Sequence, residues 1–270
     1  MSATFNPQRL EVRLSERIAA QGRIILALML RDVQTRFFGH ALGFVLAIAW
    51  PVSHIFIVLA INAAAGRAPA YGDDPALFFA TGLIPFMCFN YMSRFTMLGV
   101  LQNKPLLGYP RVKVADVLIA RAVVEVLNAG VVIIVTMVIL TAMGVDVRPP
   151  RPNEAMFALL ACMGLGLGFG LFNGVIAGIF PFWVTVFSLV QIVMWIASGV
   201  ILVPNELPEA ARWWLSWNPV LIGVEWMRSA FYDGYGSGEL LDKRYMLGAV
   251  FISIFLGLGL ERAVRGVVLR

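Results

Sequence analysis

The stretch VLIARAVVEVLNAGVVIIVTMVILTA, residues 117–142, decides the fold class of this chain. Its only ionisable side chains are Arg121 and Glu125, both in its first half. A helix of about 20 apolar residues is long enough to cross a hydrocarbon core of about 30 Å. The stretch therefore predicts a transmembrane helix.

Similar apolar runs recur along the whole chain, in which 60% of the residues are hydrophobic and 14% are charged. Soluble domains carry about 25% charged residues, so a water-soluble core is excluded. We predict an all-α integral membrane protein whose domain 41–262 contains six transmembrane helices. The expected spans are residues 41–65, 76–100, 117–142, 155–178, 183–203 and 245–262.

Two further helical segments are expected outside the spans. Within the N-terminal region 1–40, apolar residues recur at helical spacing among arginines, which favours an amphipathic helix in the bilayer interface over a plain solvated helix. The segment 204–244 interrupts an apolar stretch with Glu225 and Arg228, and we expect it to form an outer re-entrant helical loop. Three tryptophans within that loop would lie at the headgroup level: Trp213, Trp214 and Trp217.

The distribution of Lys and Arg predicts the orientation. With six spans, the N-terminal region, the loop 101–116 and the tail 263–270 lie on one side. Together with Arg262 at the end of the last span they carry twelve basic residues, whereas the short opposite loops carry only Arg67, Arg148 and Arg151. The positive-inside rule then places both termini in the cytoplasm of a bacterial inner membrane. Because the basic residues do not form one face with interleaved aromatics, nucleic-acid binding is not indicated.

Few side chains within the spans can carry chemistry. Arg94 lies in the second span, where it either grips an anionic substrate or makes a structural or snorkelling contact. Two pairs are spaced to join on one helix face, with a structural role favoured for both: Arg121 with Glu125, and Glu225 with Arg228. Neither a metal-binding set nor a catalytic triad is apparent, so we expect no metal site and no enzyme activity.

Glycines and aromatic residues complete the candidate features. The fourth span has glycine at every fourth position, 166, 170, 174 and 178, which predicts a close helix-packing seam within or between subunits. No Walker A motif follows a glycine-rich loop anywhere in the chain. Aromatic side chains of the first two spans either pack between helices or stack on sugar rings: Trp50, Phe86, Phe89, Tyr91 and Phe95.

Four segments together resemble the capsular-polysaccharide export permeases of the type-2 ABC exporters. They are RDVQTRFFGHALGFVLAIAWP at 31–51, TGLIPFMCF at 81–89, LLGYPRVKVADVLIARAVVE at 106–125 and WNPVLIGVEWMRSAFYDGY at 217–235. The resemblance implies a homodimer whose conduit passes a lipid-linked acidic polysaccharide outward. It also implies two copies of a cytoplasmic ABC ATPase that use ATP and Mg²⁺, so that this chain binds no cofactor itself, and a periplasmic adaptor beside them.

The resemblance also implies roles for particular residues. A coupling helix within 101–116 would contact the ATPase through Lys104, Tyr109, Arg111, Lys113 and Asp116. Residues facing the conduit and its substrate would be Arg94, Phe86, Phe89, Tyr91 and Trp50.

Other functions stay open at this point. Related exporters move O-antigen, teichoic acid, lipids or drugs, so the cargo is less defined than the architecture. An ion-coupled secondary transporter would show inverted repeats and intramembrane carboxylates, and a membrane-embedded transferase or phosphatase would show clustered acids or histidines. Neither pattern is clear in the spans.

Overall fold

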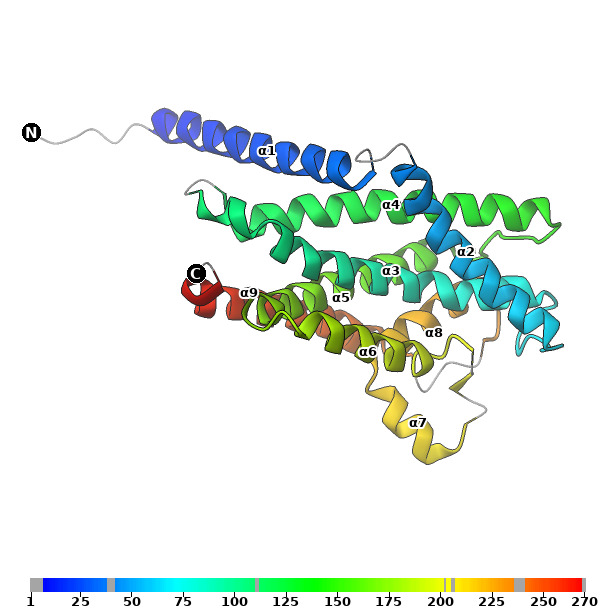
Figure 1. The fold of residues 1–270 in the computed structure, drawn as a ribbon. Helices are drawn as coiled ribbons and strands as arrows, with labels where there is room; N and C mark the ends of the chain where they lie inside the picture. Colours follow the sequence, from blue (N-terminus) through cyan, green and yellow to red (C-terminus); the bar gives the residue numbers. More distant parts are fainter. Residues whose placement is uncertain are drawn as a thin grey trace, which may run out of the picture.

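The computed structural model describes residues 7–37, 42–109, 112–201, 203–204, 207–235 and 241–268. These residues form helices and turns without a strand, which confirms the prediction of an all-α protein. In chain order the elements are α1 (Pro7–Phe37), α2 (Gly43–Ala64), α3 (Pro75–Gln102), the 3₁₀ helix η1 (Lys104–Gly108), α4 (Val114–Ala142), α5 (Pro152–Ile179), α6 (Trp183–Ile196), α7 (Glu209–Ser216), α8 (Pro219–Phe231) and α9 (Lys243–Val268) (Figure 1).

Five helices in the described part of the chain are long and apolar enough to cross a bilayer, namely α2, α3, α4, α5 and α9. The region predicted as the fifth span begins with α6, which has only 14 residues. That helix ends at a turn in which Gly199 has a φ of +69°, a conformation that favours glycine. A helix of 14 residues covers about 21 Å, which is shorter than the hydrocarbon core.

Side-chain caps explain where two of these helices begin. Asp74 precedes α3, and its Oδ1 accepts hydrogen bonds from the backbone N–H groups of Ala76 and Leu77 at 2.8 and 3.3 Å. Asn218 accepts a 3.0 Å bond from the N–H of Val220 at the start of α8. A proline follows each cap, as is common where the first helical N–H has no partner.

Helix α5 packs tightly between α3 and α9. A Cβ added at Gly166 or Gly170 would lie 2.6 or 2.5 Å from a backbone carbonyl oxygen of α3. On another face of α5, a Cβ at Gly168 would clash with Ser253 Oγ of α9. The predicted glycine seam is therefore a contact within the subunit at Gly166 and Gly170, because only glycine lets the two backbones approach this closely.

The first helix lies along the bundle (Figure 1). The α1 residues Ile24, Ile25, Leu28 and Met29 pack with the start of α4 and with Leu106 of η1, while other apolar side chains of α1 are exposed. The start of α1, η1 and the end of α9 lie at one end of the bundle, and α7 projects from the bundle elsewhere (Figure 1). All three tryptophans of the 213–217 segment are exposed.

Candidate functional site

A polar groove of about 360 Å³ opens between α2, α3 and α6. It is polar because helical spacing places polar residues of each helix on one side: Asn90 and Arg94 on α3 are one turn apart, as are Ser188 and Gln191 on α6. Arg94 is exposed, and Gln191 is buried. The polar groove is lined by His54, Phe86, Asn90, Arg94, Ser188, Gln191, Ile192 and Trp195.

Hydrogen bonds fix the α6 wall of the polar groove to α3. Gln191 Nε2 donates to Ser93 Oγ at 2.8 Å and to the backbone carbonyl of Asn90 at 3.3 Å. Gln191 is only 6% exposed, so its amide is held by α3. The two walls of the groove are therefore positioned by the protein before any ligand arrives.

An aromatic groove of about 340 Å³ lies on the neighbouring side of α3, between α2 and α4. Trp50 of α2 is 71% exposed and lines it together with Tyr91 and Phe95 of α3. The rings of Tyr91 and Phe95 are stacked, with centroids 5.9 Å apart and planes 10° apart. Exposed, ordered aromatic faces of this kind can contact the apolar face of a sugar ring.

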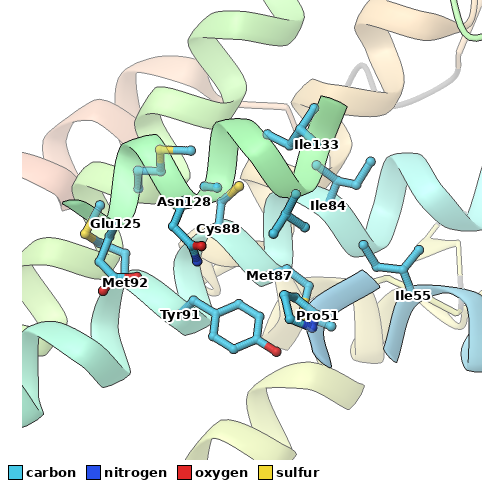
Figure 2. A pocket seen from close by; sticks show the side chains of 13 residues that line it. Pro51, Ile55, Ile84, Met87, Cys88, Tyr91, Met92, Glu125, Asn128 and Ile133 are labelled. Carbon is cyan, nitrogen blue, oxygen red and sulfur yellow. The ribbon is translucent and has the colours of Figure 1, made fainter. Parts of the chain in front are cut away.

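A small pocket of about 30 Å³ lies behind the aromatic groove, with Pro51, Tyr91 and Asn128 shared between the two. Figure 2 shows side chains from α2, α3 and α4 converging on it, with the carboxylate of Glu125 and the amide of Asn128 contributed by α4. Glu125 is 3% exposed. The pocket is too small for a sugar unit and belongs to the core.

The structure does not support a conduit role for Phe89, and it leaves Phe86 almost no exposed surface at the wall of the polar groove. Phe86 and Phe89 are 1% and 0% exposed. The Phe89 ring packs edge-on against Phe169 of α5 at 5.5 Å between centroids. Because α5 presses its glycines onto this face of α3, Phe89 has no surface for a substrate. Arg94, Tyr91 and Trp50 remain as candidates.

The predicted coupling residues have different surroundings. Tyr109 is 64% exposed, Lys113 is exposed and Lys104 is half-buried at the start of η1. Asp116, in contrast, is 3% exposed, and its Oδ2 accepts a 2.8 Å hydrogen bond from the backbone N–H of Lys113. Its carboxylate caps α4 and does not face a partner, so the prediction of a contact role for Asp116 is corrected. Arg111 lies outside the described residues.

Buried polar contacts tie α1 to this region. Arg121 of α4 lies with its Nε 3.0 Å from Asp32 Oδ2, and its Nη2 donates to Gln102 Oε1 at 3.0 Å. Arg31 donates from Nη1 to Asn103 Oδ1 at 2.9 Å. The structure thus gives Arg121 a partner on α1 that helix spacing alone did not reveal, and it links α1 to the segment around η1.

The predicted pair on α8 lies within a buried cluster. Arg228 and Glu225 are both 0% exposed, and Arg228 Nη1 is 3.5 Å from Glu225 Oε1. Arg228 also donates to the backbone carbonyls of Gly199 and Val200 at 2.7 and 2.9 Å. We call these residues and Tyr235, with their contacts, the α8 bracket.

The α8 bracket continues through a tyrosine and an aromatic ring. Tyr235 donates from its hydroxyl to Glu225 Oε1 at 2.9 Å. Burial and the charge of Glu225 raise the pKa of Tyr235, which keeps the phenol protonated and able to donate. The guanidinium of Arg228 lies 4.3 Å above the ring centroid of Phe78 on α3. The bracket therefore joins α8, α3 and the turn after α6.

A comparison with known protein families identifies the family to which this helical fold belongs. The profile of a family described as ABC-2 type transporter matches residues 23–232. The chain belongs to the ABC-2 type transporter family.

Curated relatives of this ABC-2 transporter chain have similar length. The polysialic acid transport protein KpsM of Escherichia coli is 29% identical over 236 residues, covering 87% of this chain and 91% of KpsM. The capsule polysaccharide export inner-membrane protein CtrC of Neisseria meningitidis serogroup B is 27% identical over 80% of this chain and 82% of its own. The corresponding protein BexB of Haemophilus influenzae is 24% identical over 82% and 84%.

Several groove residues of this ABC-2 transporter chain are missing from the sequence-based set. His54 follows Trp50 by four residues, Asn90 precedes Arg94 by four, and Trp195 follows Gln191 by four. A polar or amphipathic residue repeated at this interval in an apolar helix indicates one non-lipid face. That spacing could have identified them, but only the structure shows that the three helices face the same groove.

Proposed function

We propose that this chain is the membrane subunit of an ATP-driven exporter that moves lipid-linked capsular polysaccharide from the cytoplasm across the bacterial inner membrane. The observation that carries the proposal is the pair of open grooves on α3, one polar with Arg94 and one aromatic with Trp50 and Tyr91. Such walls suit a hydroxylated acidic polymer better than an acyl chain. The names of KpsM, CtrC and BexB support the same cargo class.

The membrane topology that fits this role has six spans. α6 with the turn after it would be the fifth crossing, and the segment 204–244, with α7 and α8, would form the outer re-entrant loop. The twelve basic residues of the N-terminal region, the loop 101–116 and the tail would then be cytoplasmic. The common end of the bundle for the start of α1, η1 and the end of α9 supports this arrangement (Figure 1).

A second copy of the chain would complete the conduit. In one subunit the polar groove is open, with Arg94 exposed, and an ionised side chain facing lipid costs about 2.5–3.5 kcal/mol at the bilayer centre. Facing two grooves towards each other would remove this cost and enclose a water-filled passage. A homodimer with an ABC ATPase dimer and a periplasmic adaptor is the assembly we infer.

The energy for transport would come from ATP hydrolysis by the partner ATPase, which supplies the site for ATP and Mg²⁺. Tyr109 and Lys113 are exposed where a cytoplasmic partner could contact them, and Lys104 begins η1. Leu106 of η1 packs against the cluster that includes α1, and the Asp32–Arg121 ion pair ties α1 to α4. Movement of η1 would therefore be transmitted to α1, which acts as the gate at the membrane interface.

Co-purification with the ATPase, followed by an ATP hydrolysis assay with lipid-linked glycan, tests this function. Stimulation by the glycan supports polysaccharide export. A stable complex that responds to small lipids but not to glycans would transfer the assignment to lipid export.

The coupling role has its own test. Replacing Arg111 and Lys113 with Glu should abolish export while the protein still folds and inserts. The matched control is Arg148→Glu, an exposed arginine on the opposite loop. If the Arg111→Glu, Lys113→Glu variant exports at the normal rate, the loop 101–116 does not couple to the ATPase.

A further inference from the structure

Two buried polar atoms in the polar groove lack a hydrogen-bond partner among the described residues. They are Oδ1 of Asn90 on α3 and Nε1 of Trp195 on α6. Oδ1 of Asn90 is an acceptor and the indole N–H of Trp195 is a donor. A buried polar group without a partner destabilises the fold, and such groups often mark places where something outside the chain binds.

The surroundings of the two atoms restrict what can bind. Arg94 is one helical turn from Asn90 and is exposed on the groove wall. The amide of Gln191 is already held by Ser93 and the Asn90 carbonyl, so it fixes the wall and offers little further hydrogen bonding. The groove thus presents the acceptor of Asn90, the donor of Trp195 and the cation of Arg94, together with His54 and Ser188, beside the exposed apolar side chain of Ile192.

Carbohydrate chemistry matches this set. Sugar hydroxyls can donate to the Asn90 oxygen and accept from the Trp195 N–H, and a sugar carboxylate can pair with the Arg94 guanidinium. The apolar CH face of a sugar ring can lie on an indole. An acyl chain would leave both buried atoms unpaired, so lipid tails fit the groove poorly.

We propose that Asn90, Arg94 and Trp195 form a binding subsite for one acidic sugar unit of the exported polymer. The proposal rests on the polysaccharide-export function inferred above and names the contacts through which the subunit recognises its cargo. Arg94 sets the preference for a carboxylate, whereas Asn90 and Trp195 bind hydroxyls of acidic and neutral sugars alike. The remaining conduit surface, including the aromatic groove, needs no such selectivity.

Thiol protection measures occupancy of the subsite directly. Both native cysteines, Cys88 and Cys162, are buried, so Ser188→Cys introduces an accessible thiol into the polar groove. The full chain, in complex with its ATPase in lipid nanodiscs, is labelled with a water-soluble maleimide. Labelling is repeated with increasing amounts of a sialic acid oligomer or of its carboxyl-reduced form. Ala68→Cys, at an exposed position in the loop between α2 and α3, is the control thiol.

The acidic oligomer should protect Ser188→Cys at about tenfold lower concentration than the reduced oligomer, as expected for one charge-assisted contact. Adding Arg94→Gln should remove this difference. Adding Trp195→Phe should weaken protection by both oligomers several-fold, whereas Trp214→Phe on the exposed α7 should change neither. The Ala68→Cys thiol should react equally with or without oligomer.

Equal protection by the two oligomers in the presence of Arg94, or protection that survives both substitutions, would overturn the subsite. A different result would show that the export function itself is wrong: lipid-linked glycan would then leave ATP hydrolysis by the unsubstituted complex unchanged. If glycan stimulates hydrolysis but neither oligomer protects Ser188→Cys, export stands and the subsite is wrong. Protection without stimulation would support the subsite and refute the export function.

Discussion

The α8 bracket and the polar groove each contain an arginine, Arg228 and Arg94, and the two side chains differ in burial and in pairing. Arg228 is 0% exposed, with its guanidinium committed to Glu225 and to the carbonyls of Gly199 and Val200. Arg94 is exposed on the wall of an open groove. A buried, paired charge orders the fold, whereas an exposed charge among apolar helices is available to a ligand.

The comparison predicts its largest effect on stability at Arg228. Arg228→Met should destabilise the protein by about 3–5 kcal/mol, because it leaves Glu225 buried without its cation. Thermal unfolding of the detergent-solubilised protein, followed by size-exclusion chromatography, measures this loss. The double variant Arg228→Met, Glu225→Leu should recover much of it, since an apolar pair leaves no buried charge. Equal stability of the single variant and the unsubstituted protein would refute the bracket.

A smaller loss is expected at the glycine seam that positions α3, which carries both grooves. Gly170→Ala places a Cβ 2.5 Å from the Ser93 carbonyl oxygen, so the two helices must separate. We expect a cost of about 1–3 kcal/mol in the same unfolding assay. Gly130→Ala on α4 is the matched control, because a Cβ there meets no atom within 4 Å. The seam would be disproved by identical behaviour of the two variants.

A third prediction concerns the ion pair between Asp32 and Arg121, which joins α1 to α4. Asp32→Asn weakens the ion pair with Arg121 while retaining an acceptor, so we expect a loss of about 1 kcal/mol. Glycan-stimulated ATP hydrolysis should fall more than stability does, because α1 would no longer follow η1. Asp146→Asn, an exposed change on the opposite loop, should leave hydrolysis unchanged. A normal hydrolytic response to glycan in Asp32→Asn would show that α1 moves without this pair.

The smallest effect on stability is expected at Arg94. Arg94→Gln should change the free energy of unfolding by less than about 0.5 kcal/mol, as for other exposed substitutions, yet reduce export of an acidic polymer. This profile is the reverse of that expected for Arg228→Met. Measuring unfolding and export on the same preparations checks it. A destabilised Arg94→Gln protein would indicate that Arg94 is a structural residue like Arg228.

The two regions also show what sequence reasoning can reach. Apolar runs of about 20 residues predict membrane helices because the bilayer thickness sets their length, and the all-α class followed from them. Glu225 and Arg228 are three residues apart on one helix, so their proximity could be predicted locally. The 14-residue α6 was harder to foresee, because its end depends on a glycine turn whose carbonyls bind Arg228.

Contacts between residues that are far apart in the sequence could not be predicted from helical spacing. Arg121 lies 3.0 Å from Asp32, which is far away in sequence, and no periodicity relates these residues. Phe86 and Phe89 are of the residue type expected in a conduit, and only the structure shows that both are buried, Phe89 against Phe169 of α5. The groove needs three helices brought side by side, so its members could be proposed singly from helical spacing but not as a set.

The most direct test of the export function is transport in sealed inside-out vesicles that contain this chain with or without its partner ATPase. Lipid-linked acidic glycan is supplied outside, and the glycan that becomes protected inside is measured over time. With the ATPase and ATP present, glycan should accumulate inside, whereas this chain alone should accumulate none with ATP or with an ion gradient. Nucleotide cleavage or concentrative uptake by this chain in isolation would contradict its role as a passage driven by another polypeptide.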